Sequence, residues 1–225
     1  MSKDEHTGGV KPIILLDMDG VVADFVGAII KSHKLDIQHD DWTDWNYHRE
    51  VGLTDDEFWE PTYGSDWWFI DVEAYSWATG LFTALREIGT VVFCSTPNDA
   101  INCAADKARW LNHYLGNHQE MVFTKHKHLL AKPNVVLIDD KDSNIHDFQK
   151  AGGHGVLFPQ PWNHAAWYAK EFRKDLVGNL LRMVEIVRSQ RIEMAIGVLG
   201  GQRETNRFVS SLVPPLPYSV LSKEG

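Results

Sequence analysis

Five short apolar runs, separated by helical patterns, are the feature that most constrains the fold of this 225-residue chain. Each run is continuously apolar and ends close to a polar residue or a proline, which is typical of a strand buried on both faces of a parallel sheet. The runs cover residues 12–16, 90–94, 121–123, 135–138 and 155–158. Residues 77–88, 98–115 and 143–151 lie between them and read as amphipathic helices. This alternation predicts an α/β fold with a doubly wound, Rossmann-like parallel sheet.

One segment interrupts the alternation after the first strand and helix. From residue 36 to residue 73 it has twelve acidic residues, one basic residue and five tryptophans, so its formal charge is 1 − 12 = −11. Linkers lack large aromatic side chains, so we expect a small folded cap here. The predicted division is a core of residues 1–34 and 76–191, an inserted aromatic and acidic cap of residues 35–75, and a C-terminal extension of residues 192–225.

The end of the chain differs from the rest. Residues 176–191 have the pattern of a helix, and the sequence after them looks irregular. It includes the proline-rich stretch VPPLPYSV at residues 213–220. Such a stretch can dock on a partner protein. We favour the alternative, an extension packed on the surface of its own chain.

Composition and the chain's N-terminal sequence exclude several classes of protein. The net charge of −9 opposes non-specific binding to duplex nucleic acid, which requires a basic face. Cys94 and Cys103 are the only cysteines, too few for a disulfide scaffold or a structural zinc site. The first residues are polar, and no apolar stretch approaches the roughly 20 residues of a membrane span. We expect a cytoplasmic protein with no membrane partner, either monomeric or a homodimer.

The strongest chemical signal is Asp17-Met18-Asp19-Gly20, directly after the first apolar run. Two carboxylates two residues apart suit a cation that prefers oxygen ligands, such as Mg²⁺. They also suit a reaction in which one carboxylate attacks and the other transfers a proton. Gly20 allows the tight backbone turn beside them. The alternative is a solvated turn, in which Asp and Gly are common.

Two other strand ends carry polar pairs: Ser95-Thr96 after the second run and Asp139-Asp140 after the fourth. A hydroxyl with free backbone N–H groups can bind an anion, although Thr96 could instead cap the next helix. Adjacent buried acids cost free energy unless a cation or hydrogen-bond donors compensate them. Ligands of open α/β sheets bind beyond the carboxyl ends of the strands, so these groups can converge on one phosphate. The lysines available from the preceding segment are Lys125, Lys127 and Lys132.

The sequence resembles the haloacid dehalogenase-like phosphohydrolase superfamily, because it contains the same series of motifs in the same order. These are LLDMDGVVADF, FCSTP, a lysine and LIDD. Within it, the first motif, the Cys-Ser-Thr-Pro second motif and the aromatic insert most resemble the 5′(3′)-deoxyribonucleotidases. The resemblance implies a Mg²⁺-dependent phosphomonoesterase that acts on a small-molecule substrate, a (deoxy)ribonucleoside monophosphate. Two alternatives stay open: a phosphatase of another small metabolite such as a sugar phosphate, and a non-catalytic binding protein on the same fold.

The resemblance also implies a role for each motif residue. Asp17 would be the nucleophile that forms an aspartyl-phosphate, and Asp19 the general acid and base. The metal would be held by Asp17, the backbone carbonyl of Asp19 and Asp140, with Asp139 supporting them from behind.

By the same resemblance, Ser95 and Thr96 would bind phosphate oxygens. The family's third motif has a lysine in a Thr-x-x-Lys pattern, which here begins at Thr124 and selects Lys127. The spacing to Asp139 keeps Lys132 as the alternative.

Aromatic residues of the insert are the remaining candidates, for contacts with the base and the sugar. Phe25 occupies the family's aromatic position after the first motif, and stacking of a base on an aromatic ring contributes about 1–3 kcal/mol. The other candidates are Trp45, Tyr47, Trp67, Trp68 and Phe69. The alternative is that these rings form the core of the insert itself.

Overall fold

The computed structural model describes residues 11–64 and 68–200. The chain divides into two compact units, Met1–Val187 and Arg188–Gly225. The sheet and the helices up to α7 (Ala166–Phe172) belong to the first unit. Trp67 and the stretch 213–220 lie outside the described residues.

A five-stranded sheet in which every pair is parallel forms the centre of the first unit. The strand order is β3-β2-β1-β4-β5, which confirms the predicted doubly wound α/β fold. In register, Leu16 at the end of β1 lies opposite Phe93 of β2 and Ile138 of β4. The ends of these three central strands therefore lie side by side. The strand bounds are β1 (Ile13–Leu16), β2 (Thr90–Ser95), β3 (Met121–Phe123), β4 (Val135–Asp139) and β5 (His154–Leu157).

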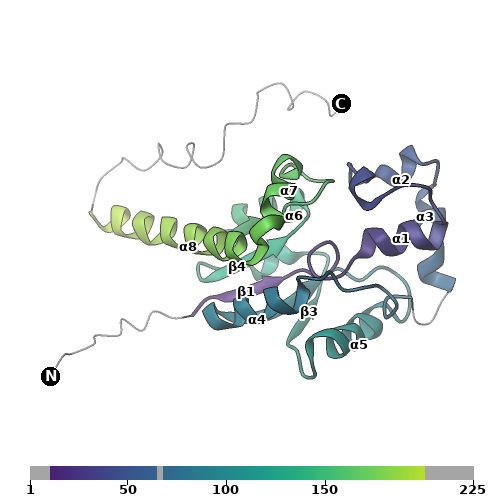
Figure 1. The fold of residues 1–225 in the computed structure, drawn as a ribbon. Coiled ribbons are helices and arrows are strands. Elements are labelled where there is room, and N and C mark those ends of the chain that lie inside the picture. Colours follow the sequence, from purple (N-terminus) through teal and green to yellow (C-terminus); the bar gives the residue numbers. More distant parts are fainter. Residues whose placement is uncertain (1–10, 65–67, 201–225) are drawn as a thin grey trace. The chain divides into compact units, whose positions relative to one another are not determined.

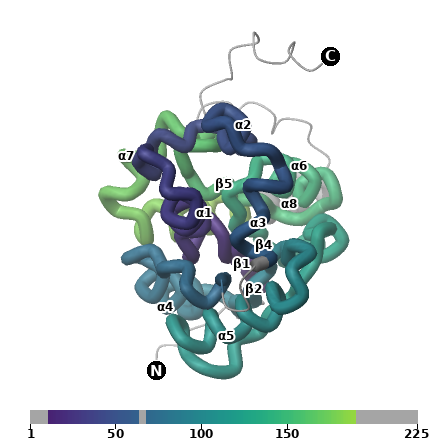
Figure 2. Tube along the Cα trace, turned by 90° about the vertical axis from the view of Figure 1, so that its right-hand side faces the viewer, coloured from purple at the N-terminus to yellow at the C-terminus, as the bar shows by residue number. Residues whose placement is uncertain are grey.

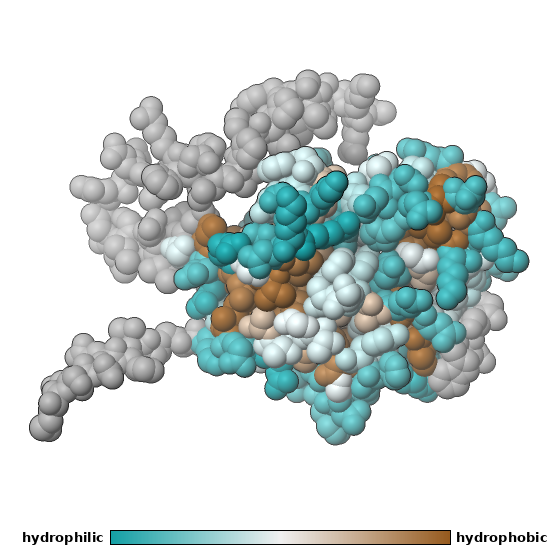
Figure 3. Space-filling model, in the orientation of Figure 1, coloured by the Kyte–Doolittle hydropathy of each residue, from teal (hydrophilic) through white to brown (hydrophobic). Residues whose placement is uncertain are grey.

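Helices cover both faces of the sheet, because side chains alternate along each buried strand. Ile14 and Leu16 face a large core shared with α4 (Ala78–Ile88), α5 (Cys103–Leu115) and the first turns of α8 (Leu176–Gly200). Leu15 and Leu137 face a second, smaller core that includes side chains of α6 (Asp142–Lys150) and of the 3₁₀ turn η2 (Lys127–Leu130). On the face seen in Figure 3, apolar side chains also reach the surface between α4 and α8.

The predicted insert forms short helices beyond the carboxyl end of the sheet, next to α1 (Figures 1 and 2). Its interior is aromatic. Phe25 of α1 packs against Phe58, Trp59 and Trp68, with ring centroids 5.5–6.2 Å apart. The elements of this layer are α1 (Phe25–His33), η1 (His39–Asp41), α2 (Tyr47–Glu50) and α3 (Asp55–Gly64).

Two helix boundaries differ from the sequence prediction. The helix predicted from residue 98 begins at Cys103, because the Asn98 carboxamide accepts a hydrogen bond from the Ala100 amide (3.1 Å) and forms a turn instead. The helix predicted over residues 176–191 continues to Gly200, although the sequence beyond 191 looked irregular. None of the described helices is both long and apolar enough to cross a membrane. The remaining short elements are a 3₁₀ turn, η3 (Arg173–Asp175), and α7.

Candidate active site

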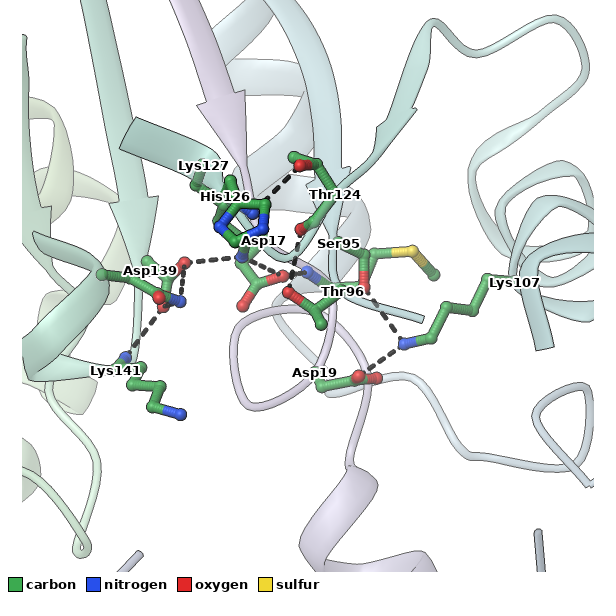
Figure 4. Close-up of polar contacts among 12 residues, drawn as sticks. Asp17, Asp19, Ser95, Thr96, Lys107, Thr124, His126, Lys127, Asp139 and Lys141 are labelled. Carbon is green, nitrogen blue, oxygen red and sulfur yellow. Dashed lines mark hydrogen bonds and ion pairs between the residues drawn. The ribbon is translucent and has the colours of Figure 1, made fainter. Parts of the chain in front are cut away.

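The polar residues that follow β1, β2 and β4 meet at the carboxyl edge of the sheet (Figure 4). Asp17 follows β1, Ser95 ends β2, and Asp139 ends β4. Since β1 lies between β2 and β4, Asp17 stands at the centre of this edge. The structure therefore brings together residues that lie more than a hundred positions apart in the sequence.

Three buried carboxylates form the centre of the site. Oxygen atoms of Asp17, Asp139 and Asp140 lie within 4.8 Å of one another. The ammonium of Lys127 is also buried and lies 2.9 Å from Asp17 Oδ1 and 2.6 Å from Asp139 Oδ2. One ammonium against three carboxylates leaves two negative charges uncompensated.

Burial determines how these groups titrate. Burial, together with the charges of Asp139 and Asp19, raises the pKa of Asp17 to about 7 against the opposing attraction of Lys127. Burial, with the charge of Asp139, also raises the pKa of Asp140 well above its usual range. The charges of Asp17 and Asp139 hold the pKa of Lys127 above its ordinary value despite its burial. The site therefore favours a bound cation, or protons in its place.

The oxygens still free to bind a cation belong to Asp17 and Asp140. Asp139 is saturated, because it accepts hydrogen bonds from Lys127, from the Asn144 amide group (3.0 and 3.1 Å) and from the Lys141 backbone (2.9 Å). Among the described residues, the carboxylate of Asp140 accepts one hydrogen bond, from Trp162 Nε1 at 2.7 Å. A divalent ion that prefers oxygen ligands fits this set of donors and its two excess charges.

Lys127 and Lys132 differ clearly in position. The side chain of Lys127 is 2% exposed and contacts two of the carboxylates, whereas Lys132 is exposed at the surface. Lys125 is also exposed and pairs with Asp99 at 3.3 Å. Lys127 is therefore the predicted lysine that lies in the site.

The two hydroxyl residues at the end of β2 occupy different places. Thr96 lines the cavity described below, and its hydroxyl donates to the Thr124 carbonyl (3.0 Å) instead of capping a helix. Ser95 is buried behind it, and its Oγ accepts a hydrogen bond from Lys107 Nζ at 3.1 Å. Lys107, on α5, also forms an ion pair with Asp19. Sequence reasoning missed this second buried lysine.

A cavity of about 550 Å³ opens between the sheet edge and the insert. Asp17, Asp19, Lys127 and Asp140 lie on its sheet side. The first residue of α1 and the insert contribute a mostly aromatic wall, formed by Phe25, Trp42, Trp45, Phe58, Trp59, Tyr63 and Phe69. The cavity thus places a charged floor opposite an aromatic wall.

The predicted aromatic contacts divide into two groups. Phe25 and Trp45 line the cavity. Trp45 is half exposed, and the ammonium of Lys141 lies over its ring, 4.4 Å from the ring centroid. Tyr47 and Trp68 are absent from the residues that line it. Trp68 is buried against Phe25 and donates to Ser32 Oγ (3.0 Å), so it packs in the interior of the insert. The sequence did not single out Trp42, Phe58, Trp59 or Tyr63 for this wall.

A polar cluster in the insert also borders the cavity. Arg49 forms two hydrogen bonds to Asp55 (3.0 and 3.1 Å), and His48 Nε2 lies 2.9 Å from the same carboxylate. The hydrogen bond from Arg49, assisted by His48, lowers the pKa of Asp55 to about 2. Asp55 therefore stays ionised and neutralised, and its charge does not repel an anion entering the cavity.

Comparison with known families gives one match, to the family described as 5′-nucleotidase, deoxy (pyrimidine), cytosolic type C protein, over residues 11–186. Among curated protein sequences the comparison found no match.

Similar solved structures include a HAD-family hydrolase from Deinococcus radiodurans with bound phosphate and sodium. It is 16% identical, with 76% of this chain and 97% of that chain covered and a TM-score of 0.44. A HAD-family enzyme from Bacteroides thetaiotaomicron, in complex with magnesium and inorganic phosphate, is also 16% identical. There the match covers 71% of this chain and 100% of that chain, with a TM-score of 0.41.

Proposed function

Because the chain belongs to this 5′-nucleotidase family and is a phosphoric monoester hydrolase, we propose that it hydrolyses nucleoside monophosphates with Mg²⁺ through an aspartyl-phosphate. The observation that carries the proposal is the pairing of Asp17 with Lys127 at the floor of a cavity whose opposite wall is aromatic. The floor suits a phosphate and the wall suits a base. In this proposal residues 35–75 act as the cap over the core.

Asp17 is the proposed nucleophile. One of its oxygens attacks phosphorus while the bond from phosphorus to the ester oxygen breaks. Asp19 gives its proton to the departing nucleoside oxygen and then takes a proton from the water that attacks the aspartyl-phosphate. The products are the nucleoside, inorganic phosphate and the original Asp17 carboxylate.

Positive charge must offset the repulsion between a phosphate dianion and these acids. Lys127 supplies one charge next to Asp17, and its contact keeps that carboxylate oriented. Asp17, Asp140 and the Asp19 carbonyl would hold Mg²⁺, which offsets the charge that develops on the transferring phosphoryl group. Asp139 would orient Lys127 from behind. Ser95 would donate its hydroxyl hydrogen to a phosphate oxygen, and Thr96 would do the same once its hydroxyl turns away from the Thr124 carbonyl.

The aromatic wall supports a nucleotide over a sugar phosphate as the substrate. A nucleobase has two flat faces and can stack against rings such as Phe25 or Trp45. A sugar phosphate needs hydrogen-bonding groups in the same place. The family's description as cytosolic supports a cytoplasmic location for the chain.

A panel of phosphomonoesters, assayed with Mg²⁺ and with a chelator, tests the proposal. We expect nucleoside monophosphates to be turned over fastest, and activity to vanish with the chelator and return with Mg²⁺. Asp17→Asn should abolish turnover, whereas Asp147→Asn, on the exposed side of α6, should retain it. A sugar phosphate turned over faster than every nucleotide would refute the substrate class, and an active Asp17→Asn variant would refute the nucleophile.

A further inference from the structure

We propose that Lys107 is a positioning residue: it donates to Asp19 Oδ2 and so holds the carboxyl group in place while the other oxygen transfers its proton to the leaving group. This inference rests on the proposed function, because it assigns Lys107 a part in that same reaction. It concerns a residue that no sequence motif singled out.

Lys107 reaches the site from α5, whose other buried residues are mostly apolar. Its side chain is 2% exposed, and its ammonium is paired with Asp19, whose side chain is 31% exposed toward the cavity. Figure 4 shows Lys107 pointing to Asp19 from the side opposite to Lys127. The two lysines therefore approach the site from different elements.

Burying an ammonium costs free energy unless a carboxylate and hydrogen-bond acceptors compensate for it. Here the compensation comes from the carboxylate of Asp19 and from Ser95 Oγ, 3.1 Å from the ammonium nitrogen. The ring of Phe69 covers the ammonium, with its centroid 5.0 Å away. Asp19 and Phe69 line the cavity, and Ser95 is buried next to Thr96, which also lines it, so the charge of Lys107 lies directly beside the site.

Asp19 depends on this contact for its orientation. Among residues 11–63 and 68–189, whose side chains the structure describes, Lys107 is the one hydrogen-bond donor found for the Asp19 carboxylate. Without it, the carboxylate of Asp19 could rotate away from the leaving oxygen. Lys127 cannot replace it, because that ammonium lies between Asp17 and Asp139.

The contact with Ser95 has a separate consequence. Because the ammonium donates to Ser95 Oγ, the hydroxyl hydrogen of Ser95 remains free to point at a phosphate oxygen. Loss of this contact should slow the hydrolysis of every phosphate ester equally. Loss of the contact with Asp19 should instead slow hydrolysis more when the leaving group is harder to expel without a proton. This difference makes the role of Lys107 measurable.

The test compares two substrates in single-turnover experiments with the full chain and Mg²⁺. A nucleoside leaves as an alkoxide and needs a proton, whereas p-nitrophenolate leaves readily without one. For Lys107→Met we expect nucleoside release to slow by about 10²-fold or more, the contribution typical of a general acid. The burst of p-nitrophenolate should slow far less, so the ratio between the two substrates changes.

Four further measurements separate positioning from a structural effect. Lys107→Arg, which keeps the charge, should restore the wild-type substrate ratio, and Lys150→Met, on the surface of α6, should leave both rates unchanged. Adding Lys107→Met to Asp19→Asn should slow nucleoside release no further. Thermal unfolding monitors the folding of each variant, and Lys107→Gln replaces the Met variant if that variant does not fold.

Equal slowing of both substrates by Lys107→Met, or no slowing of either, would overturn the inference while leaving the proposed function intact. A wild-type protein that hydrolyses no phosphate ester would overturn the proposed function and the inference with it.

Discussion

Replacing Gly20 with alanine tests how tightly the first motif is packed against Asp140, a proposed metal ligand. Gly20 has φ = +72°, a backbone conformation that costs an L-residue with a side chain roughly 1–2 kcal/mol. A Cβ atom at this position would lie 2.1 Å from Asp140 Oδ2, whereas ordinary contacts begin at 3.4 Å. The carboxylate oxygen would therefore have to move by 3.4 − 2.1 = 1.3 Å.

That movement affects both stability and activity. Trp162 Nε1 would lose its acceptor on Asp140, and an unsatisfied buried donor costs about 1–3 kcal/mol. With the backbone strain, we expect Gly20→Ala to lower the free energy of unfolding by about 2–5 kcal/mol. Displacing a metal ligand by about 1 Å should also reduce kcat/KM by about 10²-fold.

Gly52→Ala is the matched control. Gly52 has a similar φ of +83°, but no atom lies within 4 Å of the Cβ position. We expect backbone strain alone to lower the free energy of unfolding of this variant, by about 1–2 kcal/mol, and its activity to stay unchanged. Denaturant unfolding and phosphate release at several Mg²⁺ concentrations measure both effects. The reasoning fails if the two variants are equally stable and equally active.

Three further predictions concern single side chains. Lys127→Met should lower the free energy of unfolding by about 3–5 kcal/mol and abolish turnover, because two buried carboxylates lose their cation. Lys132→Met should change neither stability nor turnover. Equal effects of the two substitutions would contradict the placement of Lys127 in the site. Cys94 and Cys103 are free and buried, and burial raises the pKa of the Cys94 thiol to about 12 and also raises that of Cys103. Neither should react with a thiol reagent at neutral pH until the protein unfolds, as read by intact mass. Trp45→Ala should raise KM for a nucleotide about fivefold, which corresponds to a loss of about 1 kcal/mol of stacking free energy, with kcat little changed. An unchanged KM would show that Trp45 does not contact the substrate.

The sheet and the polar residues at its carboxyl edge could be predicted because their signals are local. Each buried strand is a short apolar run, and the polar residue that follows it, such as Asp17 or Asp139, must emerge at the same edge. The buried lysine before β4 is a different case, because the residues alone left Lys125, Lys127 and Lys132 open. Only the resemblance to the family's Thr-x-x-Lys pattern selected Lys127.

Lys107 could not be predicted in this way, because its partner Asp19 lies 88 positions away in the sequence. A weaker signal was nevertheless present. Cys103, Lys107, Trp110 and Leu111 share one face of a helix, so a lysine stood on an apolar face. A buried charge at such a position requires a partner.

The aromatic insert illustrates a different limit. Its composition indicated a folded segment rich in aromatic residues, but short helices with weak periodicity do not reveal which rings face the cavity and which pack inside the insert. Trp68 packs inside the insert and Trp59 lines the cavity, although the two residues have the same chemistry and lie in the same segment.

The central claim is that Asp17 carries the phosphoryl group during turnover, and trapping that intermediate tests it most directly. The protein is mixed with nucleoside monophosphate labelled with ³²P, quenched in acid within one turnover, and reduced with borohydride, which converts an aspartyl-phosphate to homoserine. We expect protein-bound label before the reduction, and homoserine at position 17 after it. Full turnover without protein-bound label, or homoserine at Asp19, Asp139 or Asp140 instead, would contradict the account.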